Sequence, residues 1–449
     1  MTGRAMNDIE PKLPAAFERA MQALDAQPVD GTCKGLPPTL APIAFREIGQ
    51  QGWNLLNQDL AFPVAVLKRS AVQNNREWMK AFLRHTGARI APHVKTSMSP
   101  QLFQAQLEDG AWALTAATAN QVAVLRRFGV PRILIANQVL GRQNVALLFD
   151  ELAREEGAEL LVIVDSASSL EALLEGGRGR ALKRRLGVLL EVGAPGGRTG
   201  LRDAAEARSL AQRIAGSDIV ELRGLESYES VFPGLPEEDK LPRIERMLQA
   251  MLGLASDCLA AGWFAAGEIV LSSGGSEYFD IVVKRLSEWR APQGQVVVIR
   301  SGCYLAHDHL AYARAFDRLL ARQPELDGIA PHLAGALEVW GIVQSRPEPG
   351  TFIVTVGKRD ISFDFEMPVA RLHYRPAFGA RPRALDAQYR VTRLNDQHAF
   401  VQCDAQADVQ VGDLIGFGIS HPCTTFDKWQ LIPVVDDAYD VRSAIRTFF

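Results

Sequence analysis

ELLVIVDSASSLEALLEGGRGRALKRRLGVLLEV, residues 159–192, contains a short apolar run, a stretch with helical spacing and a second short apolar run. The two runs, ELLVIVD (159–165) and LGVLLEV (186–192), have the length and the Val, Ile and Leu content of strands. A helix between two strands is the unit from which parallel sheets are built. This stretch therefore predicts an α/β fold.

The same alternation extends in both directions along the chain. Six further apolar runs have similar length and lie at 89–95, 112–116, 132–136, 219–226, 268–273 and 296–301. Helical patterns such as NQVAVLRRFG lie between them. Eight strand–helix units predict a closed (β/α)₈ barrel, with a doubly wound open sheet as the alternative.

The pattern changes after residue 335. WGIVQS, TFIVTVG, AQYRVTRL, HAFVQC and LIGFGIS read as strands separated by turn residues, with little helical pattern between them. They predict a mostly antiparallel β domain, which the early run PVAVL (63–67) can join. The predicted domains are an N-terminal extension at 1–55, a β domain at 56–68 and 335–449, and a barrel at 69–334.

Composition limits the classes of partner. The 449 residues are 47% hydrophobic and 22% charged, with a net charge of -3, which gives no electrostatic case for binding nucleic acid or an anionic membrane. The apolar runs are too short to span a bilayer, and the first residues lack the apolar segment of a signal peptide. Five scattered cysteines fit a reducing cytoplasm. We therefore expect a cytoplasmic protein.

Chemically active residues collect at the ends of the predicted barrel strands, where barrels have their active sites. Lys95 ends the first run in PHVKTSMSP, and a strand would place His93 on the same face. The loop SSGGS (272–276) follows strand 7, and Gly302 and Cys303 follow strand 8, at the usual phosphate site of a barrel. A lysine and a phosphate site together predict pyridoxal phosphate. Taken singly, the lysine could face solvent and the loop could be a tight turn.

A second candidate site lies in ISHPCTTFDKW. His421 and Cys423 are two residues apart, so a strand would present both on one face. Imidazole and thiolate suit Zn²⁺, and two protein ligands would leave positions for water or substrate. A packed cysteine beside a structural histidine is the alternative.

These motifs together resemble the D-serine dehydratase and D-threonine aldolase family, whose members have an alanine-racemase-like fold and use pyridoxal phosphate. The resemblance covers most of the chain from about residue 55. It rests on PHVKTSMSPQL, ATAN, ILIANQV, RTGL, LRGLESYES, SSGGS, GCY and GDLIGFGISHPC. It implies that Lys95 carries the cofactor. The other implied cofactor contacts are His93, Arg198, Tyr228, Ser273, Gly274, Gly275, Gly302, Cys303 and Tyr304. His421 and Cys423 would bind a divalent metal.

The resemblance also implies an activity. His-X-Cys resembles the dehydratases and suits Zn²⁺, whereas the aldolases have His-X-Asp, which suits a harder ion. We therefore expect a pyridoxal phosphate- and metal-dependent dehydratase that converts a D-β-hydroxy amino acid such as D-serine into a 2-oxo acid and ammonia. A D-threonine aldolase and a non-catalytic pyridoxal phosphate carrier are the alternatives. The resemblance further implies a homodimer.

Overall fold

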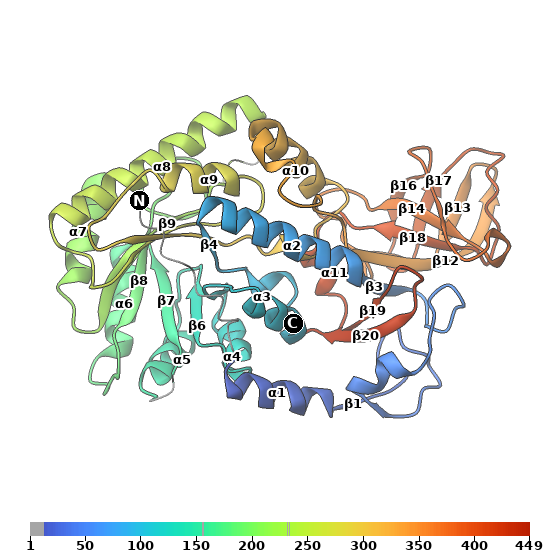
Figure 1. The fold of residues 1–449 in the computed structure, drawn as a ribbon, viewed down its shortest axis with the longest axis horizontal. Coiled ribbons are helices and arrows are strands. Elements are labelled where there is room, and N and C mark those ends of the chain that lie inside the picture. Colours follow the sequence, from blue (N-terminus) through green and yellow to red (C-terminus); the bar gives the residue numbers. More distant parts are fainter. Residues whose placement is uncertain (1–12, 155–156, 231, 233) are drawn as a thin grey trace. The chain divides into compact units, whose positions relative to one another are not determined.

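The computed structural model describes residues 13–154, 157–230, 232 and 234–449 (Figure 1). Residues 1–12 of the predicted N-terminal extension lie outside the described part. The chain divides into two compact units, each built from separate segments. Unit 1 has the described residues up to Ala20, Leu83–Lys95 and Phe103–Gly302; unit 2 has Met21–Phe82, Thr96–Leu102 and Cys303–Phe449.

Unit 1 contains an eight-stranded parallel sheet in the order β4-β11-β10-β9-β8-β7-β6-β5 (Figure 1). The two end strands also meet, because the Trp112 N–H donates to the Ile90 carbonyl and the Thr115 N–H to the Pro92 carbonyl. The sheet therefore closes, and the predicted barrel is confirmed. Its strands are β4 (Arg89–Ile90), β5 (Leu114–Ala116), β6 (Arg132–Ile135), β7 (Glu159–Val164), β8 (Leu186–Glu191), β9 (Val220–Ser227), β10 (Ile269–Ser273) and β11 (Gln295–Ile299).

The first predicted strand, 89–95, is wrong in its second half. β4 ends at Ile90, and Val94–Thr96 form the short 3₁₀ helix η2. Pro92 has no N–H to donate to a sheet, so the regular ladder is interrupted there; beyond it are an isolated bridge between His93 and Thr115 and one hydrogen bond from the His93 N–H to the Arg300 carbonyl. His93 and Lys95 therefore do not share a strand face.

Side chains from neighbouring strands fill the barrel interior. Leu134, Leu161 and Leu189 come from β6, β7 and β8 and are fully buried in one apolar cluster, together with Val270 and Val298 from the far side of the ring. Burying each such side chain contributes about 1.5–3 kcal/mol. This core holds the strand ends, and therefore the residues at the barrel mouth, in fixed positions.

The helices begin at identifiable caps. The side chains of Thr118, Ser166 and Asp203 each accept a hydrogen bond from the backbone N–H three residues later, at the starts of α4, α6 and α7. The helices of unit 1 are α4 (Ala119–Arg127), α5 (Arg142–Leu152), α6 (Ala167–Gly177), α7 (Ala204–Ala215), α8 (Glu237–Ala260) and α9 (Phe279–Leu286). Helices with residues in both units are α1 (Ala15–Asp25), α2 (Arg69–Thr86) and α3 (Pro100–Glu108).

Unit 2 contains a ten-stranded sheet in the order β13-β17-β16-β14-β18-β12-β3-β19-β20, with β15 paired to β14. Only the β19–β3 pair is parallel in this sheet as described, so the predicted mostly antiparallel character is confirmed. The strands are β3 (Val64–Lys68), β12 (Leu337–Glu348), β13 (Thr351–Val354), β14 (Val369–Tyr374), β15 (Arg383–Ala384), β16 (Arg390–Leu394), β17 (Ala399–Gln402), β18 (Leu414–Gly418), β19 (Leu431–Val435) and β20 (Val441–Arg446).

Smaller elements complete unit 2. Trp340, Leu414 and Val435 from the large sheet share an apolar cluster with Phe45 and Ile48, which precede the sheet in the chain. The remaining elements are β1 (Pro28–Val29), β2 (Ile43–Ala44), η1 (Phe45–Gln50), η3 (Cys303–Leu305), α10 (Ala311–Arg322), η4 (Pro324–Leu326), η5 (Pro376–Phe378) and α11 (Cys423–Phe426).

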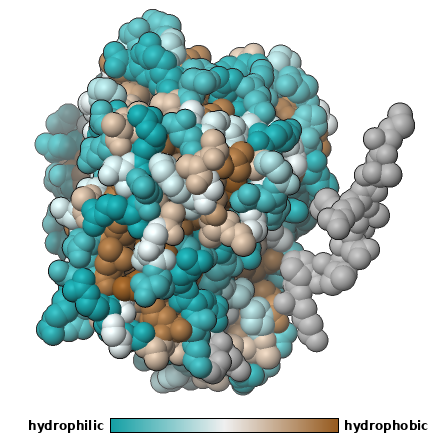
Figure 2. Space-filling model, turned by 90° about the vertical axis from the view of Figure 1, so that its left-hand side faces the viewer, coloured by the Kyte–Doolittle hydropathy of each residue, from teal (hydrophilic) through white to brown (hydrophobic). Residues whose placement is uncertain are grey.

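The surface is of ordinary composition. Hydrophilic residues cover much of the face in Figure 2, with smaller groups of hydrophobic residues between them. Within the described ranges, each helix is too short or too polar to traverse a lipid bilayer.

Candidate active site

Arg300 and Glu226 form a buried ion pair at the strand ends of unit 1. Their side chains are 5% and 1% exposed, and Arg300 Nη2 lies 2.7 Å from Glu226 Oε2. Arg300 also donates to Ser272 Oγ over 2.7 Å and to the Ser227 carbonyl over 3.1 Å. Burial raises the pKa of Glu226 to about 7, although the charge of Arg300 opposes this. The pair therefore orders three strand ends, those of β9, β10 and β11.

A second buried carboxyl, Glu229, lies in the loop after β9. Ser273 Oγ donates to Glu229 Oε2 over 3.0 Å, and burial raises the pKa of Glu229 to about 7. The neighbouring glycines are required for space. A Cβ at Gly274 would lie 2.5 Å from the Arg300 guanidinium, and one at Gly275 would lie 1.8 Å from Glu229 Oε1. The SSGGS loop is therefore shaped by these two charged side chains.

His93 stands near three positive charges, one of them that of Lys95. Lys95 is exposed, and within the described ranges its amine has no hydrogen bond or ion pair. His93 is half-buried, and its Nδ1 atom is buried without a partner. Burial, then the charges of Lys95, Arg300 and Arg198, hold the pKa of His93 well below its usual value. The imidazole is therefore neutral at pH 7.

Two further contacts order the loops after β8 and β9. The Arg198 guanidinium carbon lies 4.8 Å from the centre of the Tyr228 ring, within the range of a cation–π interaction. Glu191, at the end of β8, accepts hydrogen bonds from Gln138 and from Thr199. Burial raises the pKa of the Glu191 carboxyl despite these bonds.

This cluster has the donors that an aldehyde cofactor with a phosphate requires. Lys95 supplies an amine without a partner, and His93 Nδ1 is a buried polar atom that lacks one. Lys95, Arg198 and Arg300 are cations that favour an anion, while the two buried glutamates have pKa values near 7 and are therefore partly neutral. The residues fit pyridoxal phosphate, with Lys95 as the group that could bond the aldehyde.

A second cluster lies in unit 2 and centres on His421. His421 Nδ1 is 2.6 Å from Asp364 Oδ2, and Thr424 Oγ1 donates to the other Asp364 oxygen over 2.6 Å. The Phe365 ring stacks on the imidazole at 4.1 Å and 5°. Burial lowers the pKa of His421, but Cys423 and Asp364 outweigh it and raise the pKa overall. The carboxylate and the ring together fix the orientation of the imidazole.

Two thiols and a hydroxyl complete this cluster. Cys303 Sγ lies 3.7 Å from Cys423 Sγ, and Thr96 Oγ1 lies 3.5 Å from Cys423 Sγ and 3.8 Å from Cys303 Sγ. The hydrogen bond from Cys303 holds the pKa of Cys423 well below that of an ordinary thiol, and His421 acts in the same direction. The pKa of Cys303 is raised correspondingly. The two thiols therefore titrate as a coupled pair, in which Cys423 is the member that loses its proton more readily.

The donor set fits a thiophilic divalent metal. A carboxylate on one ring nitrogen is the usual support of a metal-binding histidine, because it leaves the other nitrogen unprotonated for the ion. Cys423 supplies a thiolate, which suits Zn²⁺. No group of three or more His, Cys, Asp or Glu side chains is arranged to hold a metal within the described ranges. As metal ligands, His421 and Cys423 would leave positions open for water or substrate, and this role stays a prediction.

The predicted site residues separate into two sets. Unit 1 has Lys95, His93, Arg198, Tyr228, Ser273, Gly274, Gly275 and Gly302, and unit 2 has Cys303, Tyr304, His421 and Cys423. Cys303, predicted for the phosphate site, contacts the Cys423 thiol and Thr96. Their roles as cofactor and metal contacts stay predictions.

Five acidic or basic residues of these clusters were missed from sequence. Glu191, Glu226, Glu229 and Arg300 lie at or within two residues of the ends of apolar strands, which is the signal that could have found them. Asp364 offered no such signal, because it precedes His421 by 57 residues and follows no recognisable motif.

Comparison with known proteins agrees with the motifs. Residues 336–435 match the family described as "Putative serine dehydratase domain". A D-threonine aldolase from Arthrobacter sp. is 24% identical over 380 residues, covering 84% of this chain and 89% of the aldolase. The predicted family resemblance is confirmed. A D-threo-3-hydroxyaspartate dehydratase from Delftia sp. (strain HT23) is 30% identical over 141 residues, 31% of this chain and 35% of the dehydratase.

Solved structures extend the likeness to the fold. The crystal structure of a D-threonine aldolase from Filomicrobium marinum has a TM-score of 0.70 and 22% identity, covering 88% of this chain and 97% of that protein. A variant of the D-threo-3-hydroxyaspartate dehydratase, solved in a metal-free form, has a TM-score of 0.67 and 19% identity, over 88% of this chain and 99% of the dehydratase. The relatives are thus enzymes, an aldolase and a dehydratase, with this two-part architecture.

Proposed function

We propose that this chain is a pyridoxal phosphate- and metal-dependent lyase that converts D-β-hydroxy amino acids such as D-serine into a 2-oxo acid and ammonia. The observation that carries the proposal is the exposed Lys95 amine, which has no partner in the described ranges and acts together with the cations Arg198 and Arg300 on the charge of His93. A lysine amine must be free of a partner in the protein to bond an aldehyde.

The residues of unit 1 would bind and orient the reactants. Bound there, pyridoxal phosphate supplies an electron sink that acidifies the proton on the substrate Cα. Lys95 would hold the cofactor and then, as a neutral amine, take the Cα proton. His93, kept neutral, can donate or accept a hydrogen bond without adding charge, and the Arg300–Glu226 pair would keep its neighbours in position.

The residues of unit 2 would act on the β-hydroxyl. His421 and Cys423 would hold Zn²⁺, which as a Lewis acid makes hydroxide a better leaving group. Asp364 and Phe365 would keep the imidazole in position for the ion. Thr96 contacts both thiols of this cluster and would help to keep them in position.

The test uses purified protein with D-serine and D-threonine. We expect ammonia and a 2-oxo acid as products, and a visible absorbance from the cofactor bound to lysine. Lys95→Ala should lose both the product formation and the absorbance. A chelator should remove the metal and lower turnover. Full activity of Lys95→Ala, or turnover unaffected by complete metal removal, would refute the proposal.

A retro-aldol lyase is the second candidate, giving glycine and an aldehyde. The observation that favours it is the long match to a D-threonine aldolase, over 84% of this chain. The thiolate of Cys423 favours the dehydratase instead, because the aldolase pattern named above has an aspartate at that position. Glycine as the product from D-threonine would select the aldolase. By the same resemblance we propose a homodimer, which a measurement of molar mass in solution would test.

A further inference from the structure

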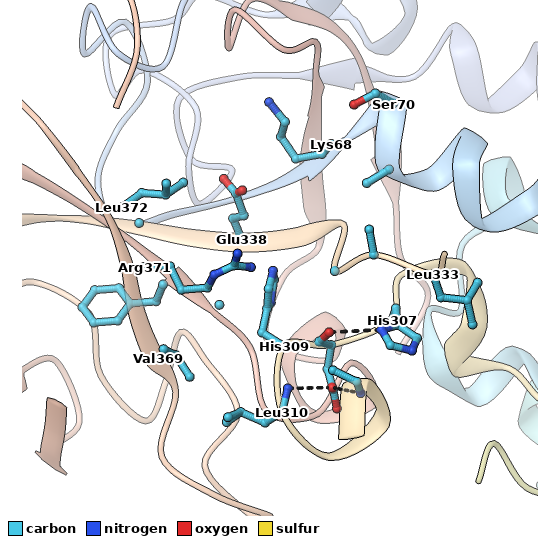
Figure 3. A pocket seen from close by; sticks show the side chains of 18 of the residues that line it. Lys68, Ser70, His307, His309, Leu310, Leu333, Glu338, Val369, Arg371 and Leu372 are labelled. Carbon is cyan, nitrogen blue, oxygen red and sulfur yellow. Dashed lines mark hydrogen bonds between the residues drawn. The ribbon is translucent and has the colours of Figure 1, made fainter. Parts of the chain in front are cut away.

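A pocket of about 710 Å³ lies within unit 2, apart from the His421 cluster (Figure 3). Its wall includes the sheet strands β12, β14 and β18 and the segment after η3. The charged and aromatic members of the wall are Lys68, His307, Asp308, His309, Glu338, Arg371, Phe417 and Tyr439. None of them belongs to the clusters described above, so the pocket needs a separate explanation.

The sheet register places opposite charges on either side of a glycine. Gly418 on β18 pairs with Glu338 on β12 and with Val369 on β14. The register of β14 against β18 shifts between Ala370 and Leu372, so Arg371 is the extra residue of a β-bulge. Bulges redirect side chains and are common beside binding sites. In Figure 3 the Arg371 guanidinium lies beside the His309 ring, and the Glu338 carboxylate extends away from it on the side of Lys68.

A residue with a side chain would not fit at Gly418, because Arg371 and His309 lie against it. A Cβ at Gly418 would lie 2.7 Å from Arg371 Cδ and 2.7 Å from His309 Cγ, and a Cβ at Gly335 would lie 2.3 Å from the His309 ring. Arg371 and His309 therefore lie side by side over Gly418. His309 Nδ1 is buried and lacks a hydrogen-bond partner.

Arg371 has no counter-ion among the described residues. Its guanidinium makes no hydrogen bond or ion pair within the described ranges, although the pocket wall lowers its pKa by desolvation. The other cation is already satisfied, since Lys68 Nζ donates to the Asp436 carbonyl over 2.9 Å and lies 3.8 Å from the Tyr439 ring centre. An arginine of this kind is suited to a carboxylate, which it can bind with two parallel hydrogen bonds.

Glu338 offers the complementary group. Its Oε2 accepts hydrogen bonds from Trp340 Nε1 over 2.8 Å and from the Tyr439 hydroxyl over 3.1 Å, while Oε1 accepts none from the described residues. The carboxyl is thus fixed in place with one oxygen available for a cationic donor. Burial raises the pKa of Glu338, and Lys68 opposes this.

The backbone around the pocket is also unusual. Tyr439 and His307, which both line it, have φ values of +65° and +49°. Left-handed backbone at bulky residues costs free energy and is found preferentially at ligand sites.

We propose that this pocket binds a small zwitterion of the amino-acid class, with its carboxylate on Arg371 and its ammonium on Glu338. The inference does not rest on the proposed function, because it uses other residues and requires no cofactor. Leu310, Leu333 and Leu372 in the wall would contact an apolar side chain of the ligand.

The test is calorimetry on the holoprotein with N,N-dimethylglycine. This zwitterion keeps one ammonium proton for Glu338 but cannot condense with an aldehyde, so it reports on the pocket alone. Propionate and trimethylammonium, which carry only one of its two charges, serve as the comparison probes. We expect N,N-dimethylglycine to bind at least about tenfold more tightly than either.

Variants locate the binding. Arg371→Met and Glu338→Gln should each weaken binding at least about tenfold. Arg371→Lys keeps the charge and should weaken binding by less, which distinguishes loss of the charge from a folding defect. Arg393→Met and Glu348→Gln alter exposed residues of the same sheet outside the pocket and should leave binding unchanged. Absence of binding, equal binding of propionate, or full binding by Arg371→Met would each overturn the proposal.

Discussion

Arg300 in unit 1 and Arg371 in unit 2 are alike in residue type and opposite in surroundings. Arg300 is 5% exposed and bonds Glu226, Ser272 and the Ser227 carbonyl. Arg371 is exposed and has no counter-ion within the described ranges. The Arg300 guanidinium is engaged by groups of the protein itself and therefore holds neighbouring residues in position. The Arg371 guanidinium is available to bind a ligand.

The largest effect should come from breaking the buried pair. Arg300→Met leaves Glu226 buried without its counter-charge, so the free energy of unfolding should fall by about 3–5 kcal/mol. Denaturant unfolding of the holoprotein measures this. The double variant Arg300→Met with Glu226→Leu should recover part of the loss, because no charge remains buried. A single-variant loss below about 1 kcal/mol would contradict the pairing.

A pH effect of somewhat smaller size should mark Glu229 in the same cluster. Its pKa is about 7 in the folded protein, against 4.5 for an ordinary glutamate, because burial disfavours the charged form. Between these values the folded protein keeps a proton that the unfolded chain has released, so stability falls as pH rises through this window. Relative to Glu229→Gln, the wild type should lose on the order of 3 kcal/mol from about pH 4.5 to about pH 7. Parallel pH profiles of the two proteins would contradict this burial.

The next largest effect, in unit 2, should come from removing the Asp364 carboxylate that supports His421. Asp364→Ala removes the carboxylate on Nδ1, which should weaken metal binding about 10–100-fold. Competition with a chromogenic chelator measures the affinity. Asp408→Ala is the matched control, since Asp408 is an exposed partner of Arg375 and should not change the metal affinity. Equal losses in both variants would point to a general charge effect.

The smallest effect should be that of Arg371 on folding. Without a partner in the protein, Arg371→Met should change the free energy of unfolding by less than about 0.5 kcal/mol in the absence of a ligand. The same denaturant experiment used for Arg300→Met measures this. A loss comparable with that of Arg300→Met would show that the two arginines have the same kind of role.

Some features of the fold and of the candidate site follow from the sequence, and others do not. Parallel strands were predictable because covered strands such as β7 and β8 are continuous apolar runs. The end of β4 was missed because a single proline, Pro92, overrides the apolar pattern. The Arg300–Glu226 pair was missed because it joins β9 to the end of β11 across β10, and local periodicity does not specify which strands lie side by side. Arg371 was not predictable at all, since a β-bulge depends on the register of two strands far apart in the chain.

The order of strands in unit 2 has a consequence for synthesis. β3 lies between β12 and β19, whose residues follow it by more than 260 positions along the chain. During translation β3 must wait for nearly the whole polypeptide before either neighbour emerges from the ribosome. The strands of the barrel emerge one after another and can pair as they do, because domains fold as their segments become available. A chain that terminates before β19 would keep one edge of β3 open, which is a recognisable mark of an unfinished protein.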